Sequence, residues 1–179
     1  KGKEDILQKV QKSKNSPAKE LLDISLDAEE YTVTFVANGQ TVTRKALFDW
    51  SKEDNERIRY YSGTAIYKTT FPWKYKEQKD RQVYLHLGTV YNLATVRVNG
   101  IDCGTVWTAP YRADITAALK KETNELEIEV TNTWANALKG TDEGKAPFEG
   151  IWTNAKYRKQ ENTLLPGGLL GPLYLEQSN

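Results

Sequence analysis

Residues 93–107 read Leu-Ala-Thr-Val-Arg-Val-Asn-Gly-Ile-Asp-Cys-Gly-Thr-Val-Trp, two extended runs joined at Asn99-Gly100. Asn-Gly is a strong signal for a tight β-hairpin, because both residues of the turn need a positive φ angle. The stretch therefore predicts one strand over 93–98 and a returning strand over 101–107. Residues 125–130, Glu-Leu-Glu-Ile-Glu-Val, alternate even more cleanly, with charges on one face and apolar side chains on the other.

The same period of two extends from this hairpin across most of the chain. Asn38-Gly39 supplies a second turn signal, and Pro72 is expected to end the strand that precedes it. The further strands expected from the pattern cover 31–36, 40–48, 63–71, 82–87 and 169–176. Eight or nine short strands with almost no helix indicate an all-β sandwich or barrel.

Helix is expected in few places. Residues 3–22 read as a helix broken once, at Ser16-Pro17, and a capped helical turn is expected where Ser51 follows Trp50. Another short helical turn is expected at 115–119. The chain is therefore divided into a helical N-terminal segment or linker, 1–22, and a β-sandwich domain, 23–179. Residues 133–168 are expected to be irregular, and because loops of that length are usually functional, binding is sought there first.

The composition excludes several classes of protein. Lys and Arg number 25 against 24 Asp and Glu, and the net charge of +1 gives no electrostatic basis for binding nucleic acid. No apolar run approaches the roughly 20 residues that cross a bilayer, and no signal peptide is visible. The single cysteine, Cys103, cannot form an internal disulfide. Methionine is absent even at the first position, which suggests that the sequence begins inside a longer protein.

The usual catalytic motifs are also missing from the sequence. The one histidine, His86, lies in an alternating stretch beside Tyr84, without a Gly-x-Ser-x-Gly motif to supply a nucleophile, and it is expected to be a strand histidine with one satisfied hydrogen bond. One Cys and one His do not make a zinc site without carboxylates. Paired carboxylates could cleave a glycoside if two of Asp114, Asp142 and Glu149 lay close together.

Several stretches resemble a known module when they are taken in order. They are 60–67, 85–90 with 94–100, 104–116 and 124–132. This order is similar to the galactose-binding-like β-sandwich of family 2 glycoside hydrolases, their so-called sugar-binding domain. The ending Gly-Gly-Leu-Leu-Gly-Pro-Leu-Tyr-Leu at 167–175, with Asp49-Trp50-Ser51 upstream, resembles the C-terminal sandwich of large bacterial α-L-rhamnosidase-like enzymes. The resemblance covers residues 28–176 and implies a jelly-roll sandwich.

The resemblance implies an accessory role rather than catalysis. In such enzymes the catalytic acids belong to a separate barrel of roughly 250 residues, which does not fit into this chain. The module would pack against that catalytic domain, contribute a loop to the rim of its active site, or bind a glycan. The resemblance also implies export to the bacterial periplasm, the cell surface or the medium. A structural calcium ion is possible, although no loop has the dense acid spacing that would place one. No other cofactor, no metal-ligand set and no membrane insertion is expected.

A sugar site would combine aromatic platforms with polar groups. The candidate residues for stacking are Trp107, Trp134, Trp152 and Tyr157, and those for hydrogen bonding are Asn136, Asp142 and Arg158. Each tryptophan could equally belong to the core or to a domain interface.

Two other functions remain open from the sequence. A structural or protein-interaction domain of a surface or periplasmic assembly would present the aromatic loops and the N-terminal helices to a protein partner. A stand-alone glycosidase would need Asp114, Asp142 or Glu149 to converge in one cleft.

Overall fold

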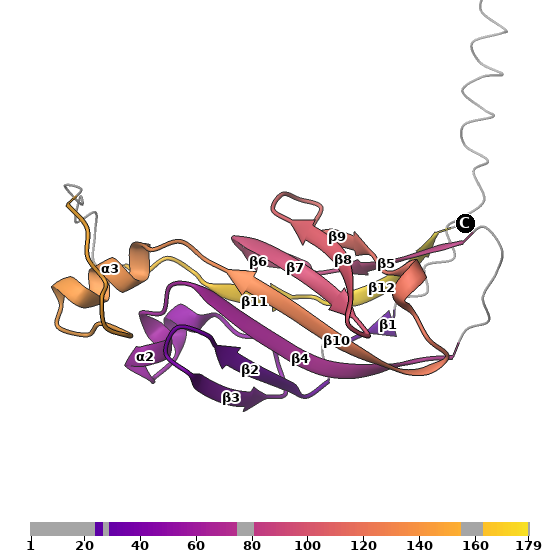
Figure 1. Cartoon of the computed structure of the whole chain (residues 1–179), viewed down its shortest axis with the longest axis horizontal. Helices are drawn as coiled ribbons and strands as arrows, with labels where there is room; N and C mark the ends of the chain where they lie inside the picture. Colours follow the sequence, from indigo (N-terminus) through magenta and orange to yellow (C-terminus); the bar gives the residue numbers. More distant parts are fainter. Residues whose placement is uncertain (1–23, 27–28, 75–80, 155–162, 179) are drawn as a thin grey trace, which may run out of the picture.

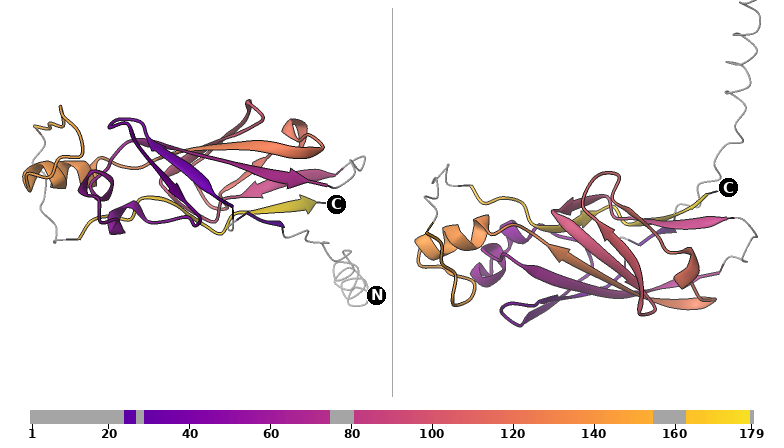
Figure 2. Two further views of the ribbon diagram at one scale, coloured as in Figure 1. Left: turned by 90° about the horizontal axis from the view of Figure 1, so that it is seen from below. Right: turned by 45° about the horizontal axis from the view of Figure 1, so that its top comes forward.

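The computed structural model describes residues 24–26, 29–74, 81–154 and 163–178. The predicted helical segment 1–22 lies outside the described residues, so the division at residue 23 stays a prediction. Within the described part, strands form two main sheets that pack face to face (Figures 1 and 2). The all-β sandwich prediction is confirmed.

The larger sheet has six strands in the order β3-β2-β4-β10-β7-β8. Its strands are β2 (Tyr31–Phe35), β3 (Gln40–Arg44), β4 (Thr64–Trp73), β7 (Leu93–Val98), β8 (Ile101–Val106) and β10 (Glu122–Thr131). The predicted 93–107 hairpin is β7–β8, and its turn has the expected positive φ angles, 52° at Asn99 and 79° at Gly100. All neighbouring pairs in this sheet are antiparallel.

The second sheet has four strands in the order β1-β12-β5-β9. They are β1 (Ile24–Ser25), β5 (Gln82–His86), β9 (Arg112–Asp114) and β12 (Tyr174–Ser178). A third, two-stranded sheet pairs β6 (Thr89–Tyr91) with β11 (Gly168–Gly171). The sequence reading of one final strand over 169–176 was wrong, because Gly171-Pro172 separates β11 from β12, and proline has no N–H for a continuous ladder.

Helical elements lie mostly at one end of the sandwich. They are the 3₁₀ turns η1 (Trp50–Lys52) and η2 (Thr116–Ala118), and the helices α2 (Glu56–Arg59) and α3 (Ala135–Asp142). The expected turn after Trp50 is present, but the caps differ from the prediction. Asp49 caps η1 by accepting from the Ser51 amide at 3.0 Å, and Asn55 caps α2 by accepting from the Arg57 amide at 3.0 Å. The turn predicted at 115–119 is η2.

Two further expectations fail for reasons of tertiary structure. Residues 133–168 are not wholly irregular, since they contain α3. Its buried residues are Asn136, Ala137 and Gly140, which gives no apolar stripe that a periodicity search could find. Pro72 does not end β4, which continues to Trp73. Its partner β2 pairs with β4 only between Ala65 and Lys68, so one edge of β4 is open at Pro72, where a missing N–H is tolerated.

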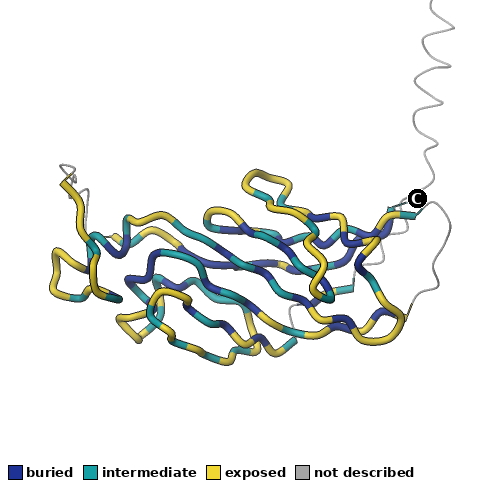
Figure 3. Tube along the Cα trace, viewed as in Figure 1, coloured by how far each residue is buried: buried dark blue, intermediate teal, exposed yellow. Residues whose placement is uncertain are grey.

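The hydrophobic core lies between the two main sheets. Alternate residues of β4, β7 and β10 point into it, and the tube in Figure 3 shows these strands with buried and exposed positions in alternation. The largest fully buried side chains include Trp50, Tyr31, Tyr61, Tyr67 and Phe35. Many of the aromatic residues therefore serve the core. Among the described residues no helix is long and apolar enough to cross a bilayer.

Candidate functional site

A chain of aromatic rings runs from the core to the surface at the end of the sandwich that carries α2 and α3. Trp50 is fully buried and meets Tyr61 edge to face, with ring centroids 5.7 Å apart. Tyr61 meets Phe148 at 5.9 Å, and Phe148 meets Trp134 at 6.1 Å, again edge to face. Trp134 is nevertheless 57% exposed. Its ring is thus held in place from the core while much of its surface stays open to solvent.

Helix α3 is fixed to α2 by a compact contact. Gly140 lies directly on Tyr60, and a Cβ atom added there would come within 2.8 Å of the Tyr60 Cβ. The Tyr60 hydroxyl donates to Glu143 at 2.7 Å, and this hydrogen bond raises the pKa of Tyr60. Lys145 pairs with Glu56 at 3.1 Å, and the hydrogen bond to Glu56 raises the pKa of Lys145. A segment that the sequence suggested was irregular is therefore ordered before any ligand binds.

Hydrogen bonds between two side chains and backbone groups fix α3 to the remainder of the sandwich. The Asn136 amide nitrogen donates to the Leu165 carbonyl at 2.7 Å, and its oxygen accepts from the Leu165 N–H at 2.9 Å. The Ser62 hydroxyl accepts from the Ala137 N–H at 3.0 Å. The bond between Ala137 and Ser62 is buried, whereas the two bonds between Asn136 and Leu165 are partly buried.

A shallow hollow of about 520 Å³ lies beside Phe148, between α2 and the loop that follows α3. Its lining combines apolar surface with a few polar groups: Arg57, Thr141, Pro147, Phe148, Glu149 and Ile151. Trp152 follows directly in the sequence and is 80% exposed. We call Trp134, Phe148, Trp152 and the lining of this hollow the α3 end. It combines exposed aromatic rings with polar side chains, as carbohydrate and protein partner sites do.

The structure brings only some of the residues predicted for sugar binding to the α3 end. Trp134, Asp142 and Trp152 lie in or next to α3 and its following loop, and all three are exposed. Asn136 is also there, but it is 3% exposed and both polar atoms of its amide are already bonded to Leu165. Asn136 therefore holds the site together rather than facing a ligand.

The other predicted residues are not part of this cluster. Trp107 is 71% exposed, but it lies in the loop between β8 and β9, in the other half of the sandwich from α3 (Figure 1). Tyr157 and Arg158 lie outside the described residues. The sequence did not single out Phe148 or Arg57, because their role depends on the packing of α3 against α2, which no local pattern encodes.

The motifs at 49–51 and 167–175 form a structural lock. The Gly167 amide donates to the Asp49 carboxylate at 3.1 Å, and the Trp50 amide donates to the Gly167 carbonyl at 3.0 Å. Gly168 has a φ of +102°, and a Cβ atom there would lie 2.5 Å from the Trp50 indole nitrogen. Only glycine lets the chain pass so close to the indole. The lock ties the strand that follows the α3 end to the core.

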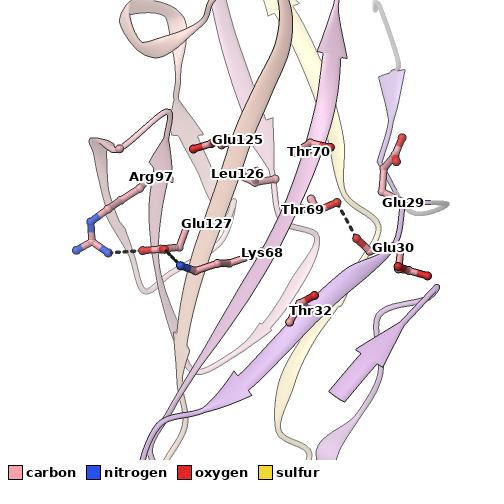
Figure 4. A pocket seen from close by; sticks show the side chains of 11 residues that line it. Glu29, Glu30, Thr32, Lys68, Thr69, Thr70, Arg97, Glu125, Leu126 and Glu127 are labelled. Carbon is pink, nitrogen blue, oxygen red and sulfur yellow. Dashed lines mark hydrogen bonds and ion pairs between the residues drawn. The ribbon is translucent and has the colours of Figure 1, made fainter. Parts of the chain in front are cut away.

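A second hollow lies on the outer face of the six-stranded sheet, where β2 diverges from β4 (Figure 4). It measures about 680 Å³, and its lining is almost wholly polar: Glu29, Glu30, Thr32, Lys68, Thr69, Thr70, Arg97, Gly100, Glu125, Leu126 and Glu127. Lys68 pairs with Glu127 at 3.0 Å, and this hydrogen bond is the main reason that the pKa of Glu127 is lowered. Leu126 is buried, so the hollow lacks an aromatic or apolar platform and has the character of a solvated sheet face.

One of the three candidate catalytic groups, Asp114, lies apart from the other two. Asp114 lies on β9, whereas Asp142 and Glu149 belong to the α3 end, in the other half of the sandwich (Figures 1 and 2). The Asp114 carboxylate accepts from the Thr116 amide at 3.0 Å, at the start of η2. Among the described residues no three His, Cys, Asp or Glu side chains gather in a way that could hold a metal ion. The possible calcium ion stays a prediction.

His86 has the structural position expected of it. Its Nε2 atom lies 2.5 Å from the Glu176 carboxylate, and its ring stacks on Tyr174 with centroids 4.4 Å apart. The side chains of His86 and Glu176 are only 12% and 6% exposed. The prediction of a strand histidine with a satisfied hydrogen bond is confirmed.

Comparison with known proteins gives relatives of one kind. A protein of Formosa agariphila that is provisionally named a beta-glucuronidase is 35% identical over 174 residues, which cover 82% of this chain but 15% of that protein. The structure of a rhamnosidase from Novosphingobium sp. PP1Y superposes with a TM-score of 0.77 at 37% identity, covering 86% of this chain and 15% of the rhamnosidase. An FMN-binding beta-glucuronidase from Facaelibacterium prausnitzii shares the fold, with a TM-score of 0.61 at 24% identity over 89% of this chain.

The chain thus spans about a seventh of the length of the first two relatives. It corresponds to one domain of much longer glycosidases. The family model described as glycosyl hydrolase 2 galactose-binding domain-like matches residues 40–164, which include eight of the twelve strands and the α3 end. This match places the resemblance found in the sequence on the same sandwich that the structure shows, and the chain belongs to the glycosyl hydrolase 2 galactose-binding domain-like family.

Proposed function

We propose that this chain is a non-catalytic accessory β-sandwich of a larger glycoside hydrolase, and that its α3 end binds carbohydrate. The observation that carries the proposal is that this chain, matched by the family model over residues 40–164, covers only 15% of the length of its Formosa and Novosphingobium relatives. The remainder of such a protein has ample length for a catalytic domain. The sandwich would support that domain and hold or orient its glycan substrate.

The placement of Asp114, away from the other two candidate acids, supports a role without catalysis. Hydrolysis of a glycoside requires two carboxyl groups within roughly 5 to 10 Å of each other, on either side of the bond. The Asp114 carboxylate accepts from the Thr116 amide and hydroxyl and lies in the other half of the sandwich from Asp142 and Glu149. The proposal leaves the hydrolytic step to the neighbouring domain.

Carbohydrate binding is supported by the construction of the α3 end. Trp134 offers an exposed ring that cannot turn freely, because Phe148 contacts it edge to face. A rigid aromatic ring provides large contact area at low entropic cost. Arg57 and Glu149 lie in the adjacent hollow and provide a donor and an acceptor for hydroxyl groups. Trp152 extends the aromatic surface beyond them.

A glycan array with the purified chain, followed by calorimetry on each hit, tests the proposal. Trp134→Ala should remove binding. The matched control is Trp107→Ala, which deletes a still more exposed indole outside the α3 end and should leave affinity unchanged. Binding that persists in Trp134→Ala would reject the proposed platform. Silence across plant, host and bacterial glycans would favour the second candidate function, a protein-interaction domain, which the exposed tryptophans also support.

An enzyme assay tests the non-catalytic part separately. The purified chain should not hydrolyse aryl glycosides, including rhamnosides and glucuronides, above the rate of a heat-inactivated sample. Turnover that is lost in an Asp142→Asn or Glu149→Gln variant would overturn the proposal. Export to the periplasm, cell surface or medium, which belongs to the same proposal, is checked by fractionating the native host with an antibody against this chain.

A further inference from the structure

The two outer faces of the sandwich have different chemistry. On the six-stranded sheet, one row of outward side chains crosses all six strands in register: Thr43, Thr32, Lys68, Glu127, Arg97 and Asp102. Its charges alternate in sign, and Glu127 pairs with both Lys68 and Arg97. Threonine, lysine and glutamate paired in this way are typical of a face that remains in water.

The four-stranded sheet carries aromatic rings on its outer face instead. By strand register, one row on this side is Tyr174, His86 and Arg112, and the next is Glu176, Tyr84 and Asp114. The side chains of His86 and Glu176 are only 12% and 6% exposed, so the open part of this face lies at Tyr84 and Arg112. Lysine is absent from both rows. Tyrosine and arginine are enriched at protein interfaces, whereas lysine and glutamate are depleted. The face therefore has the composition of a contact surface.

Most polar groups on this face are already satisfied, and one is not. His86 pairs with Glu176, and the Asp114 carboxylate accepts from the Thr116 amide and hydroxyl at 3.0 and 2.6 Å. Arg112 is different. Its guanidinium lies over the Tyr84 ring at 4.6 Å and has no hydrogen bond or ion pair with any residue of the described part. This cation–π contact holds the guanidinium against the ring, and its N–H groups have no acceptor within the described part of the chain.

Two further observations indicate what contacts this face. The β8–β9 loop, which leads directly into Arg112, projects from the sandwich and carries Trp107 at 71% exposure (Figure 1). The first and last described strands, β1 and β12, pair with each other in this same sheet. The described part of the chain therefore begins and ends in the sheet that carries this face.

We propose that this surface, made of Tyr84, Arg112 and Trp107, docks the catalytic domain of the same polypeptide, and that Arg112 binds a carboxylate on it. The inference rests on the proposed function, because it requires the longer enzyme. It goes beyond that function by assigning a different role to each of three surfaces. The α3 end would remain available to carbohydrate, the β5–β9 side would be buried against protein, and the charged face of the six-stranded sheet would face solvent.

Hydroxyl-radical footprinting tests the inference. The oxidation rates of Trp107, Tyr84 and Trp152 are compared between the natural full-length protein and the present chain. Trp107 and Tyr84 should be oxidised several-fold more slowly in the full-length protein, while Trp152 reacts at a similar rate in both. Arg112→Gln in the full-length protein should restore much of the Trp107 rate. Arg97→Gln, the matched change on the opposite face, should not.

The outcomes separate this inference from the function on which it rests. A full-length protein that contains no further domain would overturn both. A further domain with no protection of Trp107 and Tyr84 would overturn the docking surface alone. Protection that already occurs in the present chain, and grows with its concentration, would show a second copy of this chain on the face and would also overturn it.

Discussion

The Tyr67 hydroxyl provides the sharpest test of how the sandwich is held together. Tyr67 lies on β4 and is 1% exposed. Its oxygen accepts from the Trp50 indole N–H at 2.7 Å and from the Leu169 N–H at 3.2 Å. Tyr67→Phe removes this oxygen while keeping the ring, so two buried donors lose their acceptor at once.

The expected cost follows from these two contacts. A buried donor left without a partner costs about 1–3 kcal/mol, and the longer bond to Leu169 should be the weaker of the two. We therefore expect Tyr67→Phe to lower the free energy of unfolding by about 2–4 kcal/mol. Tyr84→Phe is the matched control. Its hydroxyl donates to Gln82 at 2.7 Å on the exposed face, so its removal should cost less than about 0.5 kcal/mol.

Urea denaturation followed by tryptophan fluorescence and circular dichroism measures both variants by linear extrapolation. Amide hydrogen exchange adds a local measurement, because the Leu169 N–H should exchange faster in Tyr67→Phe than expected from the change in global stability. If Tyr67→Phe unfolds with the same free energy as Tyr84→Phe, the hydrogen bonds that the Tyr67 hydroxyl accepts from Trp50 and Leu169 do not stabilise the fold.

Three other perturbations have definite expected outcomes. Gly168→Ala forces a Cβ to within 2.5 Å of the Trp50 indole at a φ of +102°, so we expect a loss of more than about 2 kcal/mol by the same denaturation assay, and an unchanged stability would contradict the close approach. Asn124→Ala removes a fully buried amide that accepts from the Lys120 N–H at 2.7 Å and donates to the Lys120 carbonyl at 3.0 Å. The substitution should lower the free energy of unfolding by about 2–3 kcal/mol. A loss below about 0.5 kcal/mol would mean that water replaces the amide. Burial raises the pKa of Tyr67 well above its usual value of 10, so the unfolded state loses this proton first and stability should fall above pH 10, by up to about 1.4 kcal/mol per pH unit for this one group. Alkaline titration of the unfolding free energy measures that slope, which should be shallower in Tyr67→Phe.

The candidate site was only partly visible in the sequence. Trp134 and Trp152 were selected from the sequence as stacking candidates, and the structure leaves both exposed; their binding of sugar stays a prediction. Asn136 was assigned to a ligand although its amide is used by the Leu165 backbone, 29 residues away. Phe148 was missed because its importance comes from contacts with Tyr61 and Trp134, which belong to other segments. These are non-local contacts, and a local pattern carries no information about them.

The strands themselves were determined by the sequence, because alternation of side chains has a period of two that any short window contains. The β7–β8 hairpin was predicted with its turn, since Asn99-Gly100 specifies positive φ angles locally. The order β3-β2-β4-β10-β7-β8 was not, because β4 and β10 are joined by pairing between residues 49 to 67 positions apart. Tertiary structure alone placed α3 against Tyr60, separated Trp107 from Trp134, and gave the two sheets different outer faces. Pairing and packing at long range are selected by the free energy of the whole fold, so only the folded molecule could show which side chains meet.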